Sequence, residues 1–182
     1  RALTRSRTTL GYLDPRHGWL VIDSGNRKTV ELFTHALRKT LGSLAVTGLR
    51  SAAAPAAVMT SWLADGGPPA DVTLEDECEL RDESDGGIVR CKGQDLTGDE
   101  IRAHLQARKQ ATRLGLTWNR RLALVLADDL TIRRLRFLDV IREQAGDAES
   151  ELERRDAEFA LMSGELALFL PRLMEMFGGP AP

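Results

Sequence analysis

Cysteine, aromatic residues and long apolar runs are scarce in this chain of 182 residues. The two cysteines, Cys78 and Cys91, are too few for the disulfide framework of a small secreted domain. No run approaches the roughly 18 consecutive apolar residues that a membrane-spanning helix needs, and the first ten residues lack the apolar core of a secretory signal. The sequence therefore predicts a cytoplasmic protein with reduced thiols and no membrane span.

Residue patterns that support catalysis are also lacking. The three histidines have no cysteine or histidine at metal-ligand spacing, and Ser163 lacks the G-x-S-x-G frame of a nucleophile. The segment "DSGNRKT" lacks the frame of a phosphate-binding loop, although Arg27 and Lys28 at the start of the following helix are candidate anion-binding residues. We expect no enzymatic activity, no metal site and no cofactor.

Hydrophobic residues make up 42% of the chain and charged residues 29%, as in average soluble proteins. The glycine- and proline-rich stretch "GGPPAD" is the best candidate linker, which predicts a first α/β lobe over 1–66 and a second over 67–182. In the first lobe we expect a hairpin over 8–24, a helix ending at Gly42, a strand over 43–49 and a short helix beginning near Pro55.

The second lobe repeats the pattern of hairpins and helices. Strands are predicted over 77–83, 86–93, 109–118, 122–126 and 130–137, and a helix over 138–146. Between them, "LTGDEIRAHLQARK" predicts a helix with a capping box formed by Thr97 and Glu100. The fold class is therefore α+β, with mixed or antiparallel sheets formed by β-hairpins and flanked by helices.

The tail from about Glu149 to Phe177 predicts a long helix. Its heptad a and d positions are occupied by Leu152, Phe159, Met162, Leu166, Phe169, Leu173 and Met176. Such a stripe is typical of core packing or of a seam between two helices. It therefore supports an alternative function, a protein-interaction or oligomerisation module that acts through this helix and through charge-complementary faces.

Charge is strongly segregated along the chain although the formal net charge is only −2. The net charge is +6 over residues 1–50, −9 over 65–100, +7 over 101–142 and −6 over 143–182. Blocks of this size predict separate positive and negative faces, or else blocks that neutralise each other across an internal interface. A positive concave face would suit a protein that binds nucleic acid.

The basic block lies on predicted strands. Alternation along 109–118 would place Lys109 and Arg113 on one face and core residues on the other, while Arg134 and Arg136 share a face of the next basic strand. Aromatic residues are only 5% of the chain, and no helix-turn-helix or zinc-finger signature is present. The pattern favours contacts with the phosphate backbone over base stacking or base-specific recognition.

Seven stretches in this order resemble the RdgC family of recombination-associated nucleoid proteins: "GWLVID", "LRKTLGSL", "MTSWLADG", "CELRD", "RKQATRLGLTW", "LTIRRLRFLD" and "FALMSGELALFLP". Family members are longer, so the resemblance implies that this chain corresponds to their C-terminal larger part. It also implies a non-enzymatic protein that binds duplex DNA without sequence preference. In the family, horseshoe-shaped subunits pair as a homodimer into a ring around DNA, which restrains a RecA-type recombinase.

The stretch "RKQATRL" is similar to the family pattern "GKQxTRL" and departs from it at Arg108, where glycine is usual. Arg108 and Lys109 also follow a predicted helix C-terminus, whose dipole they complement. Together, charge, strand phasing and resemblance give the candidate DNA-binding residues Lys109, Gln110, Thr112, Arg113, Arg134, Arg136, Arg108, Arg133, Arg27 and Lys28.

Overall fold

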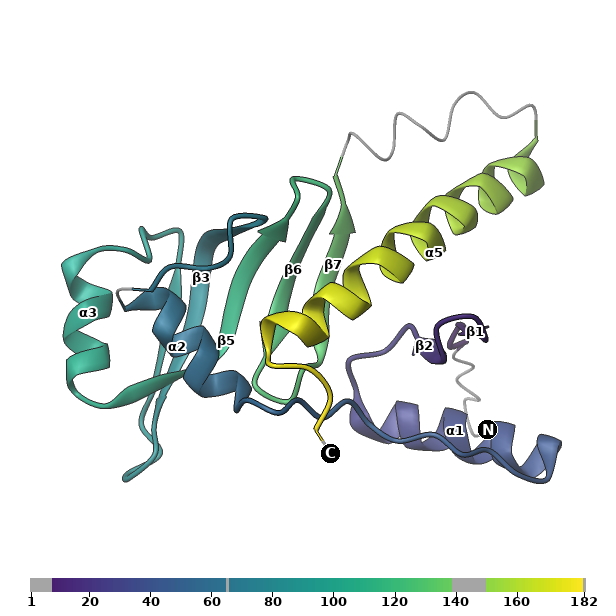
Figure 1. Ribbon diagram of the computed structural model, residues 1–182, viewed down its shortest axis with the longest axis horizontal. Helices are drawn as coiled ribbons and strands as arrows, with labels where there is room; N and C mark the ends of the chain where they lie inside the picture. The colour runs from purple at the N-terminus through teal and green to yellow at the C-terminus, as the bar shows by residue number, and fades with distance from the viewer. Residues whose placement is uncertain (1–7, 65, 139–149, 182) are drawn as a thin grey trace, which may run out of the picture. The chain divides into compact units, whose positions relative to one another are not determined.

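A computed structural model describes residues 8–64, 66–138 and 150–181 (Figure 1). The chain divides into two compact units, residues 1–48 and 49–182. This division comes before the second helix, whereas "GGPPAD" had suggested a boundary after it, at 66/67. The first unit contains β1 (Gly11–Asp14), β2 (Trp19–Ile22) and α1 (Arg27–Leu41).

The first unit is a hairpin followed by a helix, as predicted. β1 and β2 pair antiparallel, with Tyr12 opposite Val21. The side chain of Asn26 caps α1 by accepting a hydrogen bond from the amide of Thr29, and Gly42, with φ of 77°, ends the helix. The strand predicted over 43–49 is wrong, because these residues pair with no described strand. An apolar run forms a strand only where a neighbour offers backbone partners.

The second unit is built on a five-stranded antiparallel sheet with the strand order β4-β3-β5-β6-β7. The strands are β3 (Val72–Asp82), β4 (Ile88–Lys92), β5 (Lys109–Trp118), β6 (Leu122–Ala127) and β7 (Ile132–Phe137). All five strands predicted for this region are confirmed. Of the helix predicted over 138–146, residues 139–146 lie outside the described residues.

The described residues of this unit form three helices: α2 (Pro55–Leu63), α3 (Asp99–Gln106) and α5 (Glu151–Met176). α2 and α5 lie on the same side of the sheet (Figure 1). The core between them and the sheet contains fully buried side chains, including Met59, Leu80, Leu114, Leu116, Leu122, Leu126, Phe169 and Phe177. α2 packs on β5, where Thr60 Oγ1 accepts a 2.9 Å hydrogen bond from the amide of Ala111. These contacts explain why α2 belongs to the second unit.

The predicted capping box of α3 is wrong. The N-cap is Gly98, without a side-chain cap, and the helix begins at Asp99. The hydroxyl of Thr97 instead donates a 2.7 Å hydrogen bond to Asp95. Aspartate two residues upstream offers a local acceptor that competes with the helix amides.

The C-terminal helix α5 is anchored to the sheet by its second half. Phe169 packs on Trp118, with ring centroids 5.3 Å apart, and Arg121 forms two hydrogen bonds with the buried carboxylate of Glu165. At the other end of the heptad stripe, Leu152 is 72% exposed. Core packing is therefore confirmed for part of the stripe only.

Candidate nucleic-acid interface

Seven cationic side chains gather on the sheet face opposite α2 and α5. We call this surface the open face and define it by Arg81, Arg90, Lys92, Arg113, Arg133, Arg134 and Arg136. They come from β3, β4, β5 and β7. On the central strands β5 and β6 the same face carries, beside Arg113, the smaller residues Gly115, Ala123, Val125 and Ala127. The long side chains of the outer strands therefore border a shallow centre.

Alternation along the strands explains how this face arises. On β5 and β6 the leucines point to the helices and are fully or almost fully buried, while the residues between them point to the open face. Gly115 is required there, because a Cβ at this position would come within 2.9 Å of Cγ of Glu77 and 3.1 Å of its backbone oxygen. At Gly115, β5 therefore lies too close to β3 to leave room for a side chain.

A β-bulge at Thr112 breaks the predicted alternation. Glu79 pairs with Arg113, but the next residue of β3, Leu80, pairs with Ala111, so Thr112 is the extra residue on β5. Ala111 is fully buried on the helix side. Because the bulge shifts the phase by one residue, Lys109 does not share a face with Arg113, and that prediction is wrong.

Lys109 on β5 instead lies opposite Asp82 on β3 in the strand register. Its Nζ lies 3.4 Å from Oδ2 of Asp82, and both side chains are 17% exposed. Hydrogen bonds from Ser84 and the interaction with Lys109 lower the pKa of Asp82 to about 2. Gln110, paired with Arg81, lies on the side of the open face.

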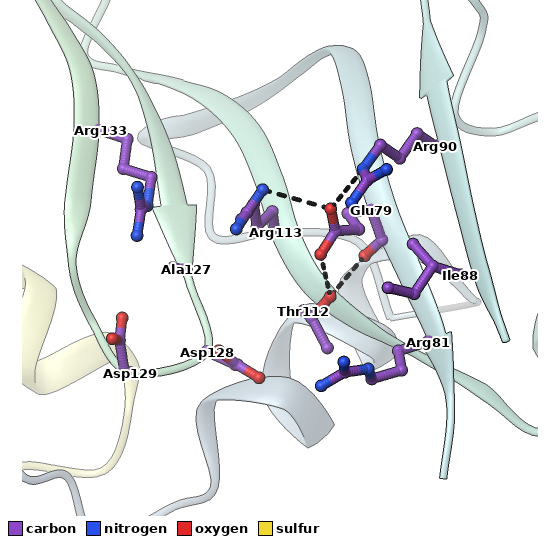
Figure 2. A pocket seen from close by; sticks show the side chains of 10 residues that line it. All are labelled: Glu79, Arg81, Ile88, Arg90, Thr112, Arg113, Ala127, Asp128, Asp129 and Arg133. Atoms are coloured by element: carbon purple, nitrogen blue, oxygen red, sulfur yellow. Dashed lines mark hydrogen bonds and ion pairs between the residues drawn. The ribbon is translucent and has the colours of Figure 1, made fainter. Parts of the chain in front are cut away.

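Glu79 is the central anion of the open face (Figure 2). Its Oε2 accepts hydrogen bonds from Nε of Arg90 at 2.8 Å and Nη1 of Arg113 at 3.2 Å. Its Oε1 accepts one from the hydroxyl of Thr112 at 3.2 Å. Burial raises the pKa of Glu79, but the hydrogen bond from Arg90 and the charge of Arg113 outweigh it, so that the pKa is lowered overall. The carboxylate thus accepts three side-chain hydrogen bonds, two of them from arginines.

Two hollows lie on the open face. The first, of about 280 Å³, is lined by Glu79, Arg81, Ile88, Arg90, Thr112, Arg113, Ala127, Asp128, Asp129 and Arg133 (Figure 2). The second includes Lys92, Arg134 and Arg136 from the outer strands and Gly115 from the centre. In it, Nη1 of Arg134 donates hydrogen bonds of 2.8 and 2.6 Å to the carboxylate of Glu77.

The acidic and basic blocks of the sequence meet on this face. The two hollows contain six acidic residues, which are Glu75, Asp76, Glu77, Glu79, Asp128 and Asp129. Three of the seven cations form ion pairs there, namely Arg90 and Arg113 with Glu79 and Arg134 with Glu77. The other four, Arg81, Lys92, Arg133 and Arg136, form no ion pair with any described residue, but Arg81 interacts electrostatically with Asp128 and Arg133 with Asp129. Neutralisation between the blocks is therefore extensive. Of the four cations without an ion pair, Lys92, Arg133 and Arg136 lie on the outer strands β4 and β7, and Arg81 lies on β3.

The remaining candidate residues lie elsewhere. Arg27 and Lys28 begin α1 in the first unit, where Arg27 pairs with Glu31 at 3.1 Å while its side chain stays 93% exposed. Arg108 follows α3 and has a φ of 62°. Arg134 and Arg136, which were predicted to share a strand face with Leu135 opposite, both line the second hollow, and so does Leu135. Of the ten candidates, six lie on or beside the open face.

Three cations of the open face were missed in the sequence, namely Arg81, Arg90 and Lys92. They are the only basic residues of the acidic block 65–100. Because the net charge of that block is strongly negative, net charge by block does not reveal them. The alternation of "IVRCK" was the available signal, since Arg90 and Lys92 are two residues apart and so share a strand face.

The described part of the chain contains neither a cluster of metal-ligating side chains nor a membrane-spanning helix. Among residues 8–64, 66–138 and 150–181, no group of three or more histidine, cysteine, aspartate or glutamate residues is placed to hold a metal ion. Within the same ranges, none of the helices has the length and apolar character needed to cross a membrane.

Comparison with known proteins gives one consistent family. Residues 1–180 match the family model described as "Putative exonuclease, RdgC". A "Recombination-associated protein RdgC" of Halorhodospira halophila is 47% identical, over 98% of this chain and 60% of that protein. Proteins of the same name from Tolumonas auensis and Dechloromonas aromatica are 46% and 42% identical over the same shares. The chain thus spans about 60% of the length of these curated relatives.

Proposed function

The chain belongs to the RdgC family, a family of recombination-associated proteins, and on this premise we propose that it binds duplex DNA through the phosphate backbone without sequence preference. The observation that carries the proposal is the set of unpaired cations on the open face. Arg81, Lys92, Arg133 and Arg136 offer charged donors that form no ion pair with a described carboxylate, although Arg81 and Arg133 lie within electrostatic range of Asp128 and Asp129. Charged donors of this kind bind phosphates whatever the base sequence.

The geometry of the open face supports backbone contact. Side chains two residues apart on one strand face lie about 6.5–7 Å from each other, close to the distance between neighbouring phosphates of one DNA strand. Arg90 and Lys92 on β4 have this spacing. On the central strands the same face carries Gly115, Ala123 and Val125, so it offers no row of aromatic rings for base stacking.

The proposal for the whole protein goes further than this chain. We propose a nucleoid-associated homodimer that encloses or covers DNA and thereby restrains a RecA-type recombinase. Its basis is the family resemblance. Lys109 and Gln110 stay candidate contacts in this assembly, although the side chain of Lys109 faces away from the open face.

One observation favours a second function, docking of another protein through α5. Leu152 begins the heptad stripe and is 72% exposed, whereas Phe169 in the same stripe is fully buried. If docking is the main function, replacing open-face cations leaves DNA affinity unchanged.

Cleavage, which the family description suggests, is tested by incubating end-labelled duplex with the protein and Mg²⁺. We expect the duplex to stay intact.

A salt titration tests the proposal. Binding of several unrelated duplexes is measured by fluorescence anisotropy at increasing salt. We expect similar affinities for all sequences and a steep loss of affinity with salt, because each neutralised phosphate releases counterions. No binding at low salt would contradict the proposal, as would an affinity that does not depend on salt.

A further inference from the structure

The first hollow of the open face brings together four guanidinium groups from four strands. Arg81 comes from β3, Arg90 from β4, Arg113 from β5 and Arg133 from β7. Arginines from four separate strands are held by the sheet itself, so their positions do not depend on a loop. A preorganised group of guanidinium donors is the arrangement that recognises phosphate oxygens.

Arg133 provides a second and independent observation. Its Nε is buried and has no hydrogen-bond partner among the described residues. A buried donor of a charged group without a partner costs free energy, so such donors are normally satisfied by protein, water or ligand. Figure 2 shows the Arg133 side chain beside the hollow, on the side opposite Arg90.

The hollow already holds one oxyanion. The carboxylate of Glu79 accepts hydrogen bonds from two arginines and one threonine, which are the donors that a phosphate oxygen would use. Glu79 is therefore an internal anion in a site suited to phosphate. Asp128 and Asp129 at the other side of the hollow limit its positive charge.

We propose that this hollow binds one phosphate group of the DNA backbone, and that Glu79 is the counter-ion with which this phosphate competes for Arg90 and Arg113. The inference rests on the proposed function and adds a defined subsite to it. Arg133 contributes its unpaired Nε, and the glutamate keeps the empty site neutralised. The group that the hollow would recognise is a phosphate oxyanion, so we expect it to bind both inorganic phosphate and a phosphodiester.

Matched variants test this subsite. Glu79→Gln removes the competing charge, and Glu77→Gln makes the same change two residues along β3, outside the first hollow. Removing one charge about 5 Å from a bound anion changes affinity by roughly threefold to tenfold. Because Glu77 pairs with Arg134 and not with an arginine of the first hollow, the readout is binding of inorganic phosphate: we expect tighter binding by that factor for Glu79→Gln and a smaller change for Glu77→Gln.

A second pair removes donors from the same strand. Arg133→Gln deletes a guanidinium of the first hollow, and Arg136→Gln deletes one that lines only the second. The NMR signals of the arginine Nε–H groups are followed during titration with inorganic phosphate. We expect a saturable shift of the Arg133 signal, a weaker shift for Arg136, and loss of phosphate binding in Arg133→Gln only. Thermal unfolding of each variant checks that it remains folded.

The outcomes separate the two proposals. If wild-type protein binds duplex but Glu79→Gln equals Glu77→Gln and Arg133→Gln equals Arg136→Gln, the subsite is wrong and the general DNA-binding proposal stands. If the Arg133 signal responds to phosphate while no duplex binds, the anion site stands and the DNA-binding proposal fails.

Discussion

Glu79 and Arg113 lie opposite each other on β3 and β5, and Nη1 of Arg113 donates a 3.2 Å hydrogen bond to Oε2 of Glu79. In the sequence they belong to blocks of opposite net charge, and the fold brings these blocks together on one sheet. Part of the segregated charge is thereby cancelled inside the molecule. The cations that form no ion pair with a described residue lie on β3, β4 and β7, and we expect DNA affinity to depend on these cations more than on the total charge of the basic block.

Substitution of two glycines by alanine is expected to have opposite effects on stability. At Gly115, the new Cβ would lie 2.9 Å from Cγ of Glu77, and overpacking of this kind costs about 1–3 kcal/mol. At Gly164 in α5 there is open space, and replacing a helical glycine by alanine gains roughly 0.5–1 kcal/mol. Urea unfolding measures the free energy of unfolding of both variants. Equal changes in the two variants would contradict the close approach of β3 to β5 at Gly115.

The anchor of α5 is expected to depend on Glu165. Its carboxylate is buried and bonded to Arg121, so Glu165→Ala removes both hydrogen bonds to a guanidinium that is 34% exposed, and is expected to cost about 1–2 kcal/mol. Glu175, which pairs with Arg172 at the surface, is the control, and Glu175→Ala is expected to cost less than about 0.5 kcal/mol. Similar melting temperatures for the two variants would contradict the anchoring role.

Acid is expected to weaken the second anchor of α5. Hydrogen bonds from Arg172 and Trp118 lower the pKa of Asp71 to about 2, from an ordinary value of 3.8. Because the pKa of Asp71 is lower in the folded than in the unfolded protein, its ionised carboxylate stabilises the fold at pH values above the unfolded pKa. This contribution to the free energy of unfolding, about 1–2 kcal/mol, is lost as the pH falls toward 2. Asp71→Asn is expected to be less stable at neutral pH and to lose less stability on acidification. Parallel pH profiles of the two proteins would contradict this.

Strands and helices were largely predictable because local patterns determine them. The strand predicted over 109–118 has those bounds in the structure, and the glycine expected to end the first helix does so at Gly42. Residues 43–49 have the apolar pattern of a strand but pair with no strand among the described residues, and whether a partner strand exists is not visible in a single sequence. Family membership was also predictable, because dense motifs span the chain.

The candidate site was predictable only in part, because it depends on register. A bulge at Thr112 places Lys109 and Arg113 on opposite faces, and nothing in the strand itself marks the extra residue. Pairing of Glu79 with Arg90 and Arg113 joins segments far apart in the sequence. Charge blocks therefore located the basic strands, but not which of their cations are unpaired.

The most direct test of the open face compares salt slopes of duplex binding. The triple variant Arg113→Gln, Arg133→Gln, Arg136→Gln is set against a control that removes three cations from helices, Arg102→Gln, Arg154→Gln, Arg155→Gln. Each lost phosphate contact lowers the magnitude of the slope of log affinity against log salt by about 0.9. We expect a decrease of about 2–3 for the open-face variant and almost none for the control. Equal slopes for the two variants would contradict the proposal that DNA binds to this face.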